Sequence, residues 1–305
     1  MMSNKNVSIL FTGQGSQYPD MGIDLTKKYS WAMERYNISS DILGYNVLEA
    51  QKKPELINLT EYSQPMIFIL SSILIDICRD YIIQNSSKII LAGHSLGEYS
   101  ALYFAKAAKF EEMLKIVKSR GESMSIVSDP KKYAMYALIK KEDQKIDYNL
   151  FGNGVYIANF NSDKQLVLCG LKKNLDEFKE KNHLGKYIPL NVSAPFHSEL
   201  MIESSKLFLE KNKSVKFNNI NFDILSNHKL INYLDIKDNE YINQLSKQIY
   251  SPVMWSDTIK KIVNFGVGTF IEIGPKKTLL NFVEREFEGK KISITNTSDI
   301  LNYVQ

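Results

Sequence analysis

The amino-acid sequence predicts an α/β protein built on a mainly parallel, doubly wound sheet with a small α+β unit inserted. Short apolar runs of strand length alternate with longer helical segments, and two of these runs end in glycine-bearing turns. Such alternation favours a parallel sheet with helices on both faces. Between about 131 and 194 the texture changes to closely spaced short strands. We therefore expect a large domain of residues 1–130 and 195–305 and a small domain of residues 131–194.

The first part of the chain predicts two buried strands, each followed by a tight turn. The strand at 7–11 leads into Gly13-Gln14-Gly15, and the strand at 88–92 leads into Gly93-His94-Ser95-Leu96-Gly97. Helices are expected at 62–84, from the second turn to about 107, and at 110–127. The first of these helices is apolar on all sides, which is typical of a helix buried inside a layered domain.

The middle of the chain predicts the small domain, and the last part returns to the large one. The small domain is expected to contain three strands and an amphipathic helix, at 133–140, 155–159, 165–170 and 172–182. After it, a helix ends near Asn212 and a strand at 269–273 precedes Gly274-Pro275. The renewed alternation indicates that this part completes the sheet of the large domain.

Composition argues against several classes of protein. A net charge of +4 is too small to indicate nucleic-acid binding, and no basic stretch alternates with aromatic residues. The most apolar stretch, 66–83, carries three charged residues and so predicts a buried helix, not a membrane span. Cys78 and Cys169 lack CxxC spacing, so they predict buried thiols and no metal site. The apolar run at the N-terminus is too short for a signal peptide, and no hydrophobic stripe is left over, so we expect a cytoplasmic monomer.

The second turn carries the candidate nucleophile. Gly93-His94-Ser95-Leu96-Gly97 matches G-x-S-x-G between a strand and a helix, where the serine sits on a sharp bend and its side chain projects above the sheet. The N-terminus of the following helix offers unpaired N–H groups, which suit the negative oxygen of a tetrahedral intermediate. Ser95 is therefore expected to act as a nucleophile.

A general base can be sought among the four histidines. His94 adjoins the serine and should point away from it, while His183 and His228 lie in polar segments and are expected at the surface. His197 follows an apolar stretch with a proline and is the best candidate, although its position alone separates it little from a core histidine. No acidic residue is obviously placed to orient it. A triad with an acid and a dyad oriented by a backbone carbonyl therefore both stay open.

Eight segments together identify a family. They are GQGSQ (13–17) followed by MG (21–22), YSQP (62–65), GHSLGE (93–98), RGESM (120–124), IANFNS (157–162), SAPFHS (193–198), Gln248 before SPVMW (251–255), and EIGP (272–275). In these segments and their order the chain resembles the malonyl-CoA:acyl carrier protein transacylases, including the free-standing acyltransferases that serve modular polyketide synthases in trans. The resemblance runs nearly from end to end.

The resemblance implies a role for each matching residue. Ser95 would be the acylated nucleophile and His197 its base. The backbone N–H groups of Gln14 and Leu96 would form the oxyanion hole. The main-chain carbonyl of Gln248 would orient the histidine, which would explain the missing acid.

Further matching positions concern the acyl group. Arg120, which alone would be interpreted as a solvent-facing helix residue, would hold the malonyl carboxylate through two parallel hydrogen bonds. Phe196 resembles malonyl-selective members, in which this side chain crowds out an α-methyl group. Asn159 and Gln64 match positions of the pocket. Thr12 stands where the family commonly has proline, and little effect is expected because the following glycines are intact.

The resemblance also implies an α/β-hydrolase-like large domain with a ferredoxin-like small domain inserted at about 131–194. The implied reaction transfers malonyl from malonyl-CoA to the phosphopantetheine of an acyl carrier protein, without a metal or other cofactor. The segments at 40–45 and 120–125 look more like the polyketide-serving proteins, although fatty acid synthesis stays open.

Two alternatives share this fold. An editing acyl hydrolase would use the same serine to release acyl groups from carrier proteins, but it would gain nothing from the carboxylate clamp of Arg120. A non-catalytic docking module would not need Ser95 and His197.

Overall fold

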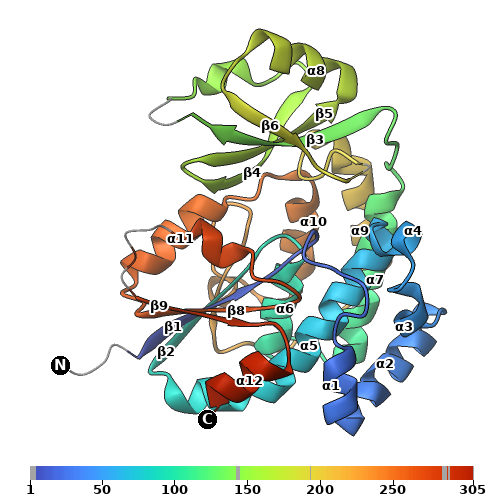
Figure 1. Ribbon diagram of the computed structural model, residues 1–305, viewed down its shortest axis with the longest axis vertical. Helices are drawn as coiled ribbons and strands as arrows, with labels where there is room; N and C mark the ends of the chain where they lie inside the picture. The colour runs from blue at the N-terminus through green and yellow to red at the C-terminus, as the bar shows by residue number, and fades with distance from the viewer. Residues whose placement is uncertain (1–4, 142–144, 193, 284–286, 288, 305) are drawn as a thin grey trace.

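The structure is a computed structural model that describes residues 5–141, 145–192, 194–283, 287 and 289–304. Ser193, which begins the SAPFHS segment, lies outside the described residues. Figure 1 shows a large lobe around a five-stranded sheet and, above it, a small lobe around a four-stranded sheet.

The large sheet is parallel throughout, which confirms the predicted fold class. Its strands are β1 (Asn6–Phe11), β2 (Lys88–Gly93), β7 (Asp223–Leu225), β8 (Thr269–Ile273) and β9 (Lys290–Ile294). They lie in the order β7-β2-β1-β8-β9, with β1 at the centre. Because the carboxyl ends of parallel strands meet at one edge, the turns after β1 and β2 lie side by side there.

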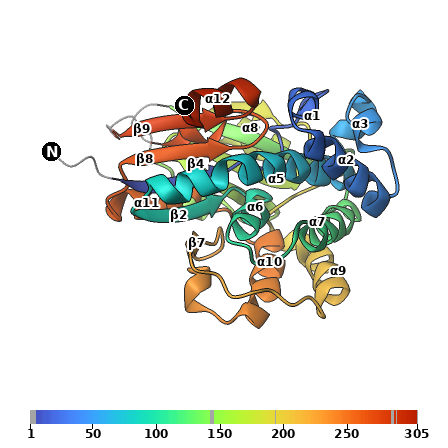
Figure 2. The same ribbon diagram turned by 90° about the horizontal axis from the view of Figure 1, so that it is seen from below.

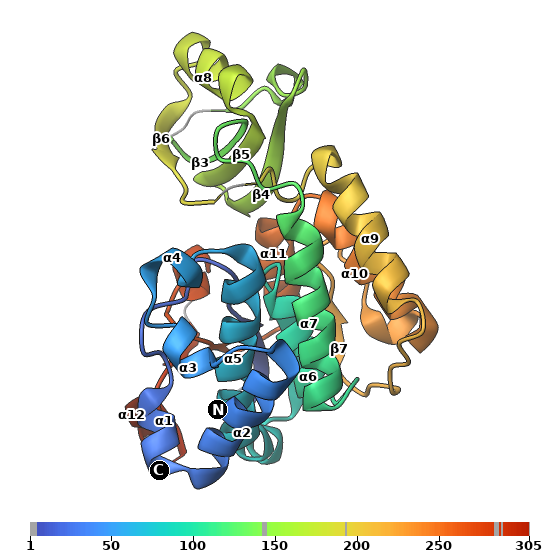
Figure 3. The same cartoon turned by 90° about the vertical axis from the view of Figure 1, so that its right-hand side faces the viewer.

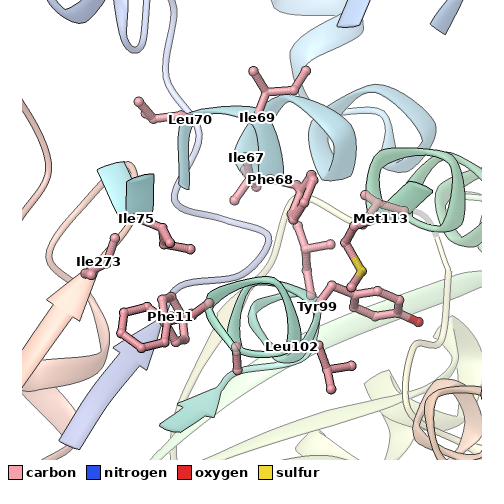
Figure 4. Packing of buried hydrophobic residues seen from close by; sticks show 14 of the residues in the cluster. Phe11, Ile67, Phe68, Ile69, Leu70, Ile75, Tyr99, Leu102, Met113 and Ile273 are labelled. Atoms are coloured by element: carbon pink, nitrogen blue, oxygen red, sulfur yellow. The ribbon is translucent and has the colours of Figure 1, made fainter. Parts of the chain in front are cut away.

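Helices cover both faces of this sheet, as expected for a parallel sheet. One face packs against α5 (Thr60–Asn85), α6 (Gly97–Phe104) and α7 (Phe110–Ser125), and the other against α11 (Trp255–Asn264). The side chains of β1 alternate accordingly: Phe11 joins the first core and Leu10 the second. Figure 4 shows Phe11 and Ile273 of the sheet facing the apolar side chains of α5 and α6.

The remaining helices lie around this core. They are α1 (Ile23–Lys28), α2 (Ser30–Leu43), α3 (Val47–Ala50), α4 (Pro54–Ile57), α9 (Ile202–Asn212), α10 (Tyr241–Tyr250) and α12 (Thr297–Val304). Figure 2 shows α9 and α10 packed together on the side of the large lobe away from α12. Short 3-10 turns at 148–150, 199–201, 233–235, 238–240 and 279–282 complete the described elements.

The small lobe is an antiparallel sheet with one α-helix. Its elements are β3 (Tyr133–Lys140), β4 (Val155–Ser162), β5 (Gln165–Leu171), α8 (Lys172–Lys181) and β6 (Gly185–Pro189). The strand order β4-β5-β3-β6 is that of a ferredoxin-like sheet. Between β3 and β4 the described residues form only a single 3-10 turn, where that fold usually has a helix. The domain limits at 131 and 194 stay a prediction.

The two lobes are joined at an edge of the small sheet. The Phe160 N–H donates to the Val253 carbonyl at 2.9 Å, and the Val253 N–H donates to the Ala158 carbonyl at 2.9 Å. The pairing of β4 with β5 shifts register between Ile157 and Asn159, so β4 is bulged where it meets the large lobe. Figure 3 shows α7 running up to this junction and leading into β3.

Within the described ranges, no helix has both the length and the apolar character needed to cross a membrane. Cys78 and Cys169 are buried thiols, as predicted. Burial raises the pKa of each of them to about 12.

Candidate active site

Ser95 lies on a tight turn between β2 and α6. Its φ of 52° is left-handed, which a non-glycine residue adopts only under constraint. A Cβ added at Gly93 would lie 1.9 Å from the carbonyl carbon of Gly97, and one at Gly97 would lie 2.0 Å from the Phe11 carbonyl oxygen. The two glycines of G-x-S-x-G are therefore required by close backbone contacts that hold Ser95 in this conformation.

His197 faces this serine. Its Nε2 lies 2.8 Å from Ser95 Oγ, and its Nδ1 lies 2.9 Å from the Gln248 carbonyl oxygen. Because a carbonyl can only accept, Nδ1 carries the proton and Nε2 is left to accept the serine O–H. No carboxylate among the described residues is hydrogen-bonded to the ring, so the arrangement is a dyad oriented by a main-chain carbonyl.

Burial lowers the pKa of His197 to about 3, and the nearby charge of Arg120 lowers it in the same direction. The imidazole is therefore neutral at physiological pH and can take a proton from Ser95.

Arg120 is only 1% exposed, so it is not a solvent-facing helix residue. Its Nη1 donates to Gln64 Oε1 at 2.7 Å. Its Nη2 donates to Ser95 Oγ at 3.0 Å and to Gln248 Oε1 at 2.8 Å. All three partners are neutral, and no described carboxylate contacts the guanidinium. A buried cation beside the nucleophile without a direct anionic partner is a site for an anionic group of the substrate.

A cavity of ≈ 410 Å³ between the two lobes opens onto Ser95 and His197, whereas Arg120, Gln64 and Gln248 are not part of its lining. It is lined by residues of both lobes: Gln14, Gly15, Gln17, Asn58, His94, Ser95, Met124, Met135, Asn159, Leu190, Asn191, Val192, Phe196, His197 and Lys276. Asn159 Oδ1 is buried and has no hydrogen-bond partner among the described residues. A ligand atom that donates a hydrogen bond could satisfy it.

Two backbone N–H groups lie on the turns beside Ser95. In the described part of the chain, neither the Gln14 N–H nor the Leu96 N–H has a hydrogen-bond acceptor. Leu96 directly precedes α6, and the next two N–H groups, of Gly97 and Glu98, donate back to the His94 and Ser95 carbonyls. Both groups are thus available to an oxygen atom bound at Ser95.

Within the described residues, the other three histidines make no hydrogen bond to Ser95 Oγ. His94 points away from Ser95, as predicted, and its Nε2 lies 3.0 Å from Asn161 Oδ1. His183 is exposed, as predicted. The prediction that His228 lies at the surface is only partly right, because this residue is half-buried at the turn after β7.

Sequence reasoning missed two residues beneath the turn. The Ser95 N–H donates to Asn227 Oδ1 at 2.6 Å, and Asn227 Nδ2 donates to the Gly93 carbonyl at 2.6 Å. Glu98, in the first turn of α6, is fully buried and accepts from the Asn227 N–H at 3.0 Å. Glu98 could have been found because it is an acidic residue in an otherwise apolar helix. No local pattern indicated Asn227, which is 132 residues from Ser95 in the sequence.

Comparisons with known proteins agree with this geometry. Residues 9–298 match the family model described as the acyl transferase domain. The chain is 32% identical over 296 residues to a malonyl CoA-acyl carrier protein transacylase of Synechocystis sp., covering 96% of this chain and 98% of that protein. It is 31% identical over 289 residues to the polyketide biosynthesis malonyl CoA-acyl carrier protein transacylase PksC of Bacillus subtilis, covering 92% and 96%.

A solved structure is similar along its whole length. The structure is PlMCAT:AntF, a type II PKS acyl-carrier protein in complex with its malonyl-transacylase. The match has a TM-score of 0.88 and 26% identity, and it covers 98% of this chain and 99% of the matched chain in that complex.

Proposed function

The chain belongs to the acyl transferase family, and we propose that it is a malonyl-CoA:acyl carrier protein S-malonyltransferase that works through an ester on Ser95. The observation that carries the choice of substrate is Arg120. Its buried guanidinium lies 3.0 Å from the nucleophilic oxygen, where the free carboxylate of a short diacid would lie once its other end is bound to Ser95. Acyl groups without a carboxylate would leave this guanidinium without a direct anionic partner.

The first half-reaction forms the acyl-enzyme. His197 Nε2 takes the proton of Ser95 as Oγ attacks the thioester carbon of malonyl-CoA. The negative oxygen that develops is stabilised by the N–H groups of Gln14 and Leu96. The C–S bond then breaks, and His197 returns the proton to the departing thiol of coenzyme A.

The second half-reaction reverses these steps with a different thiol. The phosphopantetheine thiol of an acyl carrier protein gives its proton to His197 and attacks the malonyl ester. Ser95 leaves and recovers the proton. A thioester becomes an ester and then a thioester again, so neither half-reaction needs ATP or a metal ion. None of the described residues forms a group of three or more His, Cys, Asp or Glu that could hold a metal.

Specificity follows from the buried residues around the ester. Gln64 and Gln248 hold the guanidinium of Arg120 in place, beside the serine oxygen to which the malonyl group is attached. Phe196 is buried and lines the cavity next to His197. We assign it to crowding out an α-methyl group, a discrimination of about 1–3 kcal/mol.

The destination of the malonyl group is proposed to be a polyketide synthase carrier. The segments at 40–45 and 120–125 and the similarity to PksC support this choice. Fatty acid synthesis is the alternative. Comparing transfer rates to carrier proteins of the two pathways would decide between them.

The test of this function is acylation measured by intact mass. The protein is mixed with malonyl-CoA, or separately with acetyl-CoA, before any carrier protein is added. The wild type should gain one malonyl group, and Ser95→Ala should gain none. Arg120→Ala should lower the preference for malonyl over acetyl about 100-fold, because hydrogen bonds to charged groups contribute about 1.5–3 kcal/mol each. Arg79→Ala, which removes an arginine that donates to the Phe104 carbonyl and does not contact Ser95, is the matched control.

Two outcomes would contradict the proposal. An unchanged malonyl preference in Arg120→Ala would show that the arginine does not bind the carboxylate. A wild type that forms no malonyl adduct, but releases free acids from acyl carrier proteins, would be an editing hydrolase.

A further inference from the structure

The buried carboxyl of Glu98 has no role in the mechanism above. It lies in the first turn of α6, three residues after the nucleophile, and is fully buried. Its Oε2 accepts from the Asn227 N–H at 3.0 Å and from Gln248 Nε2 at 2.8 Å. Its Oε1 contacts the Tyr233 hydroxyl. The Asn227 N–H and the Gln248 NH₂ group can only donate hydrogen bonds, and the Tyr233 hydroxyl can donate one. The three partners together therefore fit an ionised carboxylate.

Opposing effects act on the protonation of this group. Burial raises the pKa of Glu98 above its ordinary value, while its three hydrogen bonds and the charge of Arg120 oppose the rise. The hydrogen bonds of the carboxyl group show which of its two oxygens cannot carry a proton. Oε2 already accepts two N–H groups, which leaves no place for a proton on that oxygen.

The side-chain amide of Gln248 links Glu98 to Arg120. Its Oε1 accepts from Arg120 Nη2 at 2.8 Å. Its Nε2 donates to Glu98 Oε2 at 2.8 Å and to the Ser95 carbonyl at 2.9 Å. A flipped amide would set its NH₂ against the guanidinium and its oxygen against a carboxylate, so only this orientation is favourable. The dipole of the amide thus lies between a cation and an anion, with each end facing the opposite charge.

The link through Gln248 explains how the buried charge of Arg120 is stabilised before the substrate binds. The guanidinium of Arg120 donates to the neutral groups of Gln64, Ser95 and Gln248 and lies over the Tyr99 ring, 5.3 Å from its centroid. Among the described carboxylates, Glu98 is the one whose charge acts on the guanidinium. An arriving malonyl carboxylate therefore does not meet an isolated cation, because part of that charge is already balanced.

We propose that Glu98 is the internal counter-charge of Arg120, coupled to it through the Gln248 amide, and that it limits how strongly the pocket prefers an acyl group with a carboxylate. The inference rests on the proposed function. The resident anion stabilises the empty site and weakens the hold on malonyl, which helps the ester to be passed on. Glu98 is thus a positioning residue that acts on the substrate through Gln248 and Arg120.

Glu98→Gln removes the charge and can keep a hydrogen bond to each of the three partners, with the direction of the one to Tyr233 reversed. The amide oxygen can stand where Oε2 is and accept from Asn227 and Gln248, while the NH₂ group stands where Oε1 is and donates to the Tyr233 oxygen. Glu272→Gln is the matched control. Glu272 is another fully buried glutamate, and its carboxylate accepts from the backbone N–H groups of residues 278–280 without contacting Arg120 or Gln248.

The experiment compares the second-order rates of Ser95 acylation by malonyl-CoA and by acetyl-CoA. In Glu98→Gln the malonyl-to-acetyl ratio should rise about 10-fold, as expected for removing a charge that acts across one intervening group. In Glu272→Gln the ratio should stay within about two-fold of the wild type, even if the melting temperature falls, because Glu272 is not among the groups that act on the Arg120 guanidinium.

An unchanged or lower malonyl-to-acetyl ratio in Glu98→Gln would overturn the proposal, because it would show that the carboxyl group carries no charge that interacts with Arg120. Tyr233→Phe is a second test of the proposal, for use if Glu98→Gln does not fold. It removes a donor that favours the ionised carboxyl, so it should raise the ratio in the same direction but less. No change in that variant would also count against the proposal. Absence of a malonyl adduct in the wild type would instead overturn the proposed function itself.

Discussion

At the scale of single residues, the site combines a neutral base with a buried cation. Arg120 donates to the same serine oxygen that faces His197, and its charge helps to keep the imidazole unprotonated. A malonyl carboxylate on the guanidinium would balance that charge and make the imidazole a stronger base. The substrate that fits the clamp would thereby also raise the reactivity of the dyad, whereas an acetyl group would not.

This coupling predicts the pH dependence of acylation. A lowered pKa means that His197 takes up a proton only in acid, so the base form persists below pH 6.5. With acetyl-CoA, which has no titrating acyl group, the second-order acylation rate should stay level from about pH 8 to about pH 5. Arg120→Ala removes one cause of the lowered pKa of His197, so the pH at which the acylation rate falls in acid should move up toward 6.5. A wild-type rate that halves near pH 6.5 would contradict the account.

At the scale of elements, the turn from β2 to α6 was the most predictable part of the molecule. The G-x-S-x-G spacing between a buried strand and a helix predicted its position, and close backbone contacts at Gly93 and Gly97 explain the spacing. The strand β6 was not predicted. It lies at the edge of the small sheet and is largely exposed, so its sequence lacks the apolar pattern that marks buried strands.

The turn predicts a large effect of Gly97→Ala. A methyl group there would meet the Phe11 backbone carbonyl at 2.0 Å, so β1 or the turn must move. We expect a loss of stability of about 2–3 kcal/mol and at least a ~100-fold loss of acylation, because a 1 Å displacement of a reacting group has that cost. Gly44→Ala is the control: its φ of 82° is also left-handed, but no atom lies within 4 Å of the new methyl. It should lose about 1 kcal/mol and keep its activity, which thermal melts and acylation rates would check.

At the scale of the whole molecule, the site is assembled from segments far apart in the chain. Ser95 was predictable from a local motif, but Arg120 and Gln248 were proposed only because the family resemblance places them. Helical position alone would have put Arg120 in solvent. Asn227 had no signal, because its contacts depend on how β7 packs beside β2. Local patterns predict strands, helices and turns, whereas the hydrogen bonds across the site depend on tertiary packing.

The junction of the two lobes predicts that the small sheet helps to form the site. Val253→Pro removes the N–H that donates to the Ala158 carbonyl and leaves that carbonyl without its partner, next to Asn159 of the cavity wall. Val253→Ala keeps both backbone hydrogen bonds and loses only buried methyl groups, so it should cost comparable stability, about 2 kcal/mol. Acylation should nevertheless fall about 10-fold in the proline variant and less than about two-fold in the alanine variant, because only the proline lets the small lobe move away from Ser95. If equal losses of stability brought equal losses of activity, the junction would serve folding alone, and the cavity would not depend on how the lobes are held together.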